Sequence, residues 1–115
     1  MQIIPTRKFK ADVKFYIKKK KHNKINEDIQ PILDALNEGN FLGDKLEDIE
    51  LEEGTAAYKV RVANSYSGKF NGYRIIYYVV IDEKIYLLTI YSKKDDSRVP
   101  NDKQISMMIK NIIEE

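Results

Sequence analysis

A nine-residue stretch, YRIIYYVVI at positions 73–81, is aliphatic or aromatic at every position except Arg74. β-Branched and aromatic residues favour strands, and successive side chains of a strand point to opposite faces of a sheet. A stretch that is apolar on both faces is typical of a central strand, so we predict that position for it. A chain of 115 residues has room for one such core. We therefore expect a single domain over residues 1–115.

The segment 58–63 predicts a neighbouring strand with one polar face. Lys59 and Arg61 alternate there with apolar residues. Because side chains alternate with a period of two in a strand, both cations are expected to project from the same face.

Two other segments complete the expected sheet. IYLLTIYS at 85–92 follows a short turn and predicts an antiparallel hairpin with 73–81. The segment 2–5 is a candidate edge strand, because its Pro5 has no N–H to donate to an inner ladder. We expect a mainly antiparallel sheet of three or four strands.

Helices are predicted where apolar residues recur at intervals of three and four. The first is capped by Thr6, the second covers 27–37 and the third is capped by Asn101. Pro31 suits only a first turn, so the regular part of the second helix is expected to begin one residue before it. Gly39 is its expected stop. The fold class is therefore α+β, with two N-terminal helices and one C-terminal helix packed on the sheet.

The composition excludes several classes of site. The chain has no Cys, so it has no disulfide, thiolate metal site or catalytic thiol. The single histidine, His22, follows a run of four lysines and is predicted to be a solvated loop residue. One histidine cannot make a multi-histidine zinc site. No GxxxxGK(S/T), GxGxxG or GxSxG motif occurs, and we expect no metal and no cofactor.

The same composition suggests a cellular location. A chain without Cys suits a reducing cytoplasm. The N-terminus lacks the apolar run of a secretion signal, and no run of about 18 apolar residues occurs. We expect a cytoplasmic protein with no membrane partner.

Charge is segregated along the chain. Residues 7–24 contain nine Lys or Arg and one acid, residues 34–54 contain eight acids and one Lys, and residues 58–94 contain seven Lys or Arg and two acids. Two basic segments around an acidic one are typical of a protein with a polyanionic partner, although charged runs often only solvate a surface. The acidic stretch 43–54 has no sustained period and is predicted to be a loop.

Cations gather at the ends of the predicted strands. If these strands are neighbours, one surface carries six cations: Lys59, Arg61, Lys69, Arg74, Lys93 and Lys94. Such a surface suits a phosphate backbone, and its affinity should fall with salt because neutralised phosphates release counterions. Tyr66 and Tyr91 are candidates either for stacking on an unpaired base or for core packing. Arg74 has an alternative role as a structural arginine, because a buried guanidinium needs carbonyl or carboxylate partners.

YKVRV at 58–62, followed by SGKFNGYRIIYYVVIDEKIYLLTIYSKKD at 67–95, resembles the catalytic half of the RelE/ParE superfamily of type II toxin–antitoxin toxins. The likeness is strongest to RelE and to the HigB-like branch with its GK-x-x-GYR loop. It implies a small RelE-like fold and a ribosome-dependent mRNA endonuclease, an mRNA interferase that needs no metal. The ribose 2′-hydroxyl attacks its own neighbouring phosphate, and basic residues stabilise the developing charge. The implied partners are a cognate antitoxin, the ribosome and mRNA, with operator DNA bound only through the antitoxin.

The resemblance assigns roles to individual positions. Lys59 and Arg61 match the two basic strand positions of RelE, and Arg74 matches the arginine of the GYR motif, a phosphate clamp. Lys69 and Tyr91 match the HigB-like pattern. The implied catalytic residues are Lys59, Arg61, Arg74, Tyr91 and Lys94, and the implied RNA-binding residues are Lys69, Lys93 and Tyr66.

Two positions depart from the RelE pattern. Lys94 stands where the family has an arginine implicated as the general acid, and lysine lacks the planar fork of arginine. Pro100 stands nearest the position of the catalytic tyrosine, for which Tyr91 is the expected replacement. These departures keep two alternatives open: a ParE-like inhibitor of DNA gyrase, and a non-catalytic RNA-binding or interaction module. The intact basic positions favour RNA cleavage.

Overall fold

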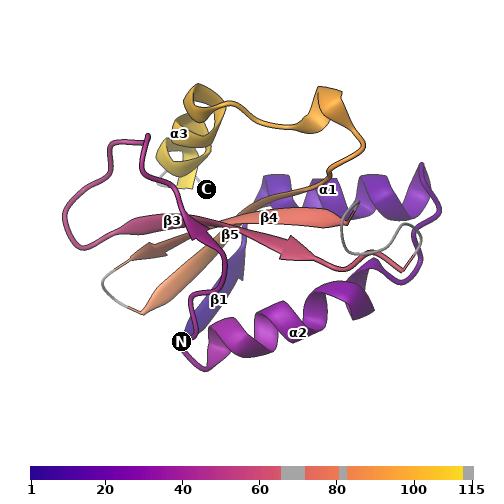
Figure 1. Ribbon diagram of the computed structural model, residues 1–115, viewed down its shortest axis with the longest axis horizontal. Coiled ribbons are helices and arrows are strands. Elements are labelled where there is room, and N and C mark those ends of the chain that lie inside the picture. Colours follow the sequence, from indigo (N-terminus) through magenta and orange to yellow (C-terminus); the bar gives the residue numbers. More distant parts are fainter. Residues whose placement is uncertain (66–71, 81–82, 113–115) are drawn as a thin grey trace.

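The protein is a small α+β domain built on one five-stranded sheet (Figure 1). The computed structural model describes residues 1–65, 72–80 and 83–112. The strand order is β1-β5-β4-β3-β2, in which β1 runs parallel to β5 and the other pairs are antiparallel. The strands are β1 (Gln2–Pro5), β2 (Asp44–Lys45), β3 (Ala56–Val62), β4 (Tyr73–Val80) and β5 (Lys84–Ser92).

The central position predicted for the stretch 73–81 is confirmed over β4, which lies third of the five strands. The hairpin with β5 and the edge position of β1 are also confirmed. The predicted strand number is wrong because the acidic stretch 43–54 is not wholly a loop. Its residues Asp44 and Lys45 pair with β3 as a fifth strand.

Helices cover both faces of the sheet. The helices are α1 (Arg7–Lys18), α2 (Ile25–Asn37) and α3 (Asp102–Asn111). Helices α1 and α2 share one core with the sheet, while α3 packs over the other face. Figure 1 shows α2 and α3 on opposite sides of the strands. None of the helices in the described ranges is long and apolar enough to cross a membrane.

The predicted helix caps are present, but the start of α2 is not where the sequence placed it. The Thr6 hydroxyl accepts from the Phe9 N–H at 3.3 Å, and Asn101 forms a complete capping box with Gln104. Helix α2 begins at Ile25, so Pro31 lies in its second turn. A proline there removes one backbone hydrogen bond, and the burial of the apolar face of α2 outweighs that loss. Gly39, with φ of 85°, ends the helix as predicted.

Strand β5 contains an irregularity that decides which side chains reach each face. Ile76 pairs with Thr89 and Tyr77 pairs with Leu87, so Leu88 is an extra residue in β5. A bulge of this kind reverses the alternation of side chains beyond it. Leu87 and Ile90 therefore both face α1 and α2, whereas Leu88 and Tyr91 both face α3.

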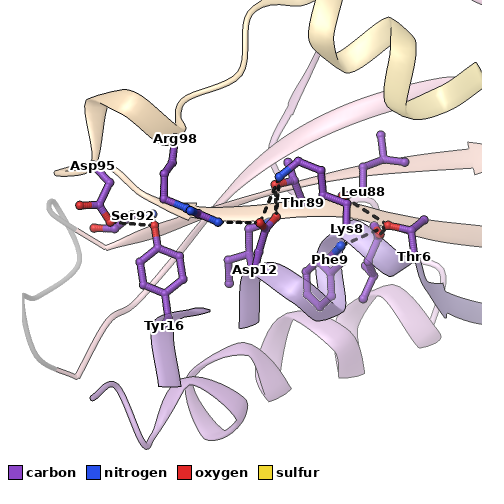
Figure 2. A network of polar contacts seen from close by, with 12 residues as sticks. Thr6, Lys8, Phe9, Asp12, Tyr16, Leu88, Thr89, Ser92, Asp95 and Arg98 are labelled. Atoms are coloured by element: carbon purple, nitrogen blue, oxygen red, sulfur yellow. Dashed lines mark hydrogen bonds and ion pairs between the residues drawn. The ribbon is translucent and has the colours of Figure 1, made fainter. Parts of the chain in front are cut away.

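The carboxylate of Asp12 in α1 binds the chain at this bulge (Figure 2). Asp12 is only 2% exposed. Its carboxylate accepts from the Thr89 hydroxyl and from the Ile90 N–H, the latter at 3.4 Å. Arg98, from the short helix after β5, donates to it at 2.8 Å, and Lys8 donates at 3.0 Å. One acid thus joins α1, the bulge and the segment after β5.

Replacing Asp12 by Ala should lower the free energy of unfolding by about 3 kcal/mol, because a buried ion pair loses one partner and a buried hydroxyl loses its acceptor. Urea unfolding followed by circular dichroism measures the loss. Asp34→Ala, which removes an exposed acid of α2, is the matched control and should change stability by less than about 0.5 kcal/mol. Equal effects of the two substitutions would show that the buried network contributes nothing beyond helix propensity.

Candidate functional site

A surface hollow lined mostly by basic side chains lies on the α3 face of the sheet, and we call it the basic hollow. Its volume is about 320 Å³, and it is lined by Asp44, Lys59, Arg61, Arg74, Tyr91, Lys93 and Val99. Strand pairing places these residues. Ala57 and Ile76 belong to the core under α3, and Lys59, Arg61 and Arg74 lie two or four residues from them on the same strands. The hollow therefore occupies sheet surface next to the core that α3 covers.

Three of its residues form one row across the sheet. Arg61 of β3 pairs with Arg74 of β4, and Arg74 pairs with Tyr91 of β5. Side chains directly opposite one another on neighbouring strands have Cβ atoms about 5 Å apart. Two arginines in that arrangement repel, so an anion bound between them would be stabilised by both. Lys59, two residues before Arg61, extends the positive surface toward β2.

Arg74 is held by the backbone at the start of β4. Its side chain is 8% exposed. One terminal nitrogen donates to the carbonyl oxygens of Tyr73 at 3.2 Å and Gly72 at 3.5 Å. Arg74 therefore has the expected structural role, since it binds backbone carbonyls, and it also lines the hollow. A guanidinium fixed in this way needs little reorganisation to meet an anion.

Tyr91 reaches the hollow because of the bulge in β5. Regular alternation from Leu87 would have turned its ring toward α1 and α2, and the extra residue turns it toward α3 instead. The ring is 5% exposed and packs in the core with Ile105, which favours packing over base stacking. Burial raises the pKa of the Tyr91 phenol, while the Arg74 charge opposes that rise. The phenol therefore keeps its proton at neutral pH and is able to donate it.

The remaining predicted site residues fall into three groups. Lys93 lines the hollow, and its N–H donates to the Gly72 carbonyl at 3.1 Å. Lys94 follows the end of β5 in a turn, is exposed and is not among the residues that line the hollow. Lys69 and Tyr66 lie outside the described residues.

His22 lies on the opposite face of the sheet, in a loop as predicted, but it is half-buried and not fully solvated. Its Nδ1 is 2.7 Å from the Tyr73 hydroxyl, and its ring stacks on Tyr16 with centroids 5.7 Å apart. Burial lowers the pKa of His22. The Tyr16 hydroxyl accepts from the Ser92 N–H and donates to Asp95, both at 2.8 Å. This cluster fixes the ends of β4 and β5 beside the hollow but contributes no group to it.

Two residues that line the hollow, Asp44 and Val99, were not predicted from the sequence. Asp44 was one of eight acids in a segment expected to form a loop. The available signal was Gly43, which precedes it. Gly43 has φ of 96°, and a Cβ there would lie 2.3 Å from the Lys59 carbonyl oxygen. Only glycine lets the chain approach β3 this closely, and that approach brings Asp44 opposite Lys59.

Within the described ranges, no three His, Cys, Asp or Glu side chains come together in a way that could hold a metal ion. The described lining of the hollow presents cations, a phenol and a carboxylate. Comparison with known family models and with curated proteins found no match to this chain.

Arg61→Ala and Arg74→Ala should differ in stability although both remove one cation from the same row. Arg61 is exposed, so its loss should change the free energy of unfolding by less than about 0.5 kcal/mol. Arg74 is buried and bound to two carbonyls, so its loss should cost about 2 kcal/mol. Urea unfolding of both variants measures the difference. Equal losses would mean that the carbonyl contacts of Arg74 do not stabilise the fold.

Proposed function

We propose that this protein is the toxin of a type II toxin–antitoxin system, a ribosome-dependent mRNA endonuclease of the RelE/ParE type. The observation that carries the proposal is the Arg61, Arg74 and Tyr91 row, flanked by Lys59 in one hollow. These are positions to which the sequence resemblance assigns catalytic roles. The mainly antiparallel sheet with helices on both faces is compatible with the fold that the resemblance implies.

In the proposed reaction, the ribose 2′-hydroxyl attacks the adjacent phosphorus and the bond to the 5′-oxygen of the next nucleotide breaks. The products are a 2′,3′-cyclic phosphate and a 5′-hydroxyl. Negative charge grows on the phosphoryl oxygens in the transition state, and the proposal assigns its stabilisation to Lys59, Arg61 and Arg74, which line the hollow. Fixed cations aimed at such charge are each worth roughly 10²- to 10³-fold in rate, by analogy with oxyanion-hole donors.

Tyr91 is the proposed proton donor to the leaving 5′-oxygen. Tyr91 lines the hollow, and its phenol retains its proton at neutral pH because burial raises its pKa. The resemblance points to Lys94 for this role, but Lys94 lies outside the hollow. We therefore assign the donor to Tyr91, and we assign Lys93 to the phosphate of a flanking nucleotide.

The hollow is small and open, which explains the proposed need for the ribosome. A volume of about 320 Å³ suits one nucleotide unit and gives few contacts to the bases on either side. The mRNA must then be aligned by a second macromolecule, and in this proposal the decoding site of the ribosome does so. A cognate antitoxin would inhibit the reaction by covering the same cations, in a cytoplasmic complex.

Controlled expression of the protein with mapping of mRNA 5′ ends tests the proposal. Wild type should produce breaks phased with codons in translated mRNA, and Arg61→Ala should reduce them by about 10²-fold. Lys14→Ala removes a lysine from the exposed surface of α1 and should leave cleavage unchanged. Intact mRNA with a DNA-damage response would instead identify a gyrase inhibitor. Intact mRNA with no effect on growth would support the alternative of a non-catalytic RNA-binding or interaction module.

A further inference from the structure

One carboxylate lies among the cations of the basic hollow. Asp44 pairs with Lys59 across β2 and β3 and lines the same space as Arg61, Arg74 and Tyr91. Among the described residues, every other charged side chain that lines the hollow is a cation. A lone acid in a phosphate site weakens the binding of phosphate, because like charges repel. Its presence there calls for a role other than binding.

We propose that Asp44 is the general base of the cleavage reaction, the group that takes the proton from the attacking 2′-hydroxyl. This inference rests on the proposed function. The 2′-oxygen forms its bond to phosphorus as its proton passes to an Asp44 carboxylate oxygen. The bond from phosphorus to the 5′-oxygen breaks, and that oxygen receives a proton from Tyr91. Proton exchange with water then restores both side chains.

The chemistry of the other lining residues leaves the proton acceptor to Asp44. An ammonium or guanidinium group carries no free acceptor while protonated, and arginine is always protonated in proteins. The Tyr91 phenol also keeps its proton at neutral pH. The Asp44 side chain is exposed, and its carboxylate has two acceptor oxygens. Among the described lining residues, Asp44 alone is ready to accept a proton.

The position of Asp44 depends on the backbone before it. Gly43 lies so close to β3 that an added Cβ would come within 3 Å of three Lys59 and Val60 backbone atoms. The two-residue strand β2 follows at once, with Asp44 opposite Lys59. The acid and the cations are therefore held by the same strand pairing.

Asp44→Asn tests the role directly in ribosomes programmed with a defined mRNA. Loss of the base should reduce single-turnover cleavage by about 10²- to 10⁴-fold. It should leave unchanged or tighten the binding of an mRNA that carries a 2′-deoxyribose at the cleavage position, since a negative charge has been removed. Asp48→Asn, an exposed acid that does not line the hollow, should match wild type.

The outcomes separate this inference from the function on which it rests. If wild type cleaves and Asp44→Asn cleaves within about threefold of it, Asp44 is not the base and the nuclease assignment stands. The same conclusion follows if the variant loses cleavage only in proportion to weakened binding. If wild type binds the programmed ribosome and cuts nothing, the nuclease assignment fails and this inference fails with it.

Gly43→Ala provides a second test that leaves the carboxylate in place. The added Cβ should push β2 from β3 and reduce cleavage by at least tenfold. Gly39→Ala is the matched control, because Gly39 also has positive φ, of 85°, but has nothing within 4 Å of the added atom. Both substitutions introduce backbone strain, but only Gly43→Ala should displace Asp44. Equal cleavage by the two variants would contradict the proposed dependence on the position of Asp44.

Discussion

The Asp12 carboxylate satisfies the polar groups at the bulge of β5, and the arrangement of the α3 face depends on that bulge. Without the extra residue, regular alternation would turn the Tyr91 side chain toward α1 and α2. With it, Tyr91 joins Arg61 and Arg74 in one row on the other face. A buried acid from α1 therefore helps to build a site on the opposite side of the sheet. Arg98 extends the same network to the segment that leads to Val99, at the rim of the hollow.

Period and spacing in the sequence were enough to predict much of the fold. The stretch 73–81, which is apolar on both strand faces, correctly predicted the central position of β4. The alternation in β3 correctly predicted that Lys59 and Arg61 share one face. The Thr6 and Asn101 caps fixed the starts of two helices. These features depend on neighbouring residues, so short windows of sequence reveal them. The parallel pairing of β1 with β5 joins segments that are far apart and left no local pattern.

Most of the cations of the site could be predicted from the sequence, but Asp44 could not. Four of the six expected cations come together in the hollow: Lys59, Arg61, Arg74 and Lys93. The location of Asp44 follows from a two-residue strand, which is too short to show any period. Asp12 reads as an ordinary acid of a basic helix, because its partners Thr89 and Arg98 come from far along the chain.

We expect phosphate to bind on the α3 face of the sheet and not on the lysine-rich surface of α1. A titration of the ¹⁵N-labelled protein with a short single-stranded RNA that carries a 2′-deoxyribose tests it most directly. Amide shifts are expected to cluster at Lys59, Arg61, Arg74 and Tyr91 and to weaken as salt rises. Shifts centred on Lys14 and Lys18 of α1, with the strand residues unmoved, would contradict it.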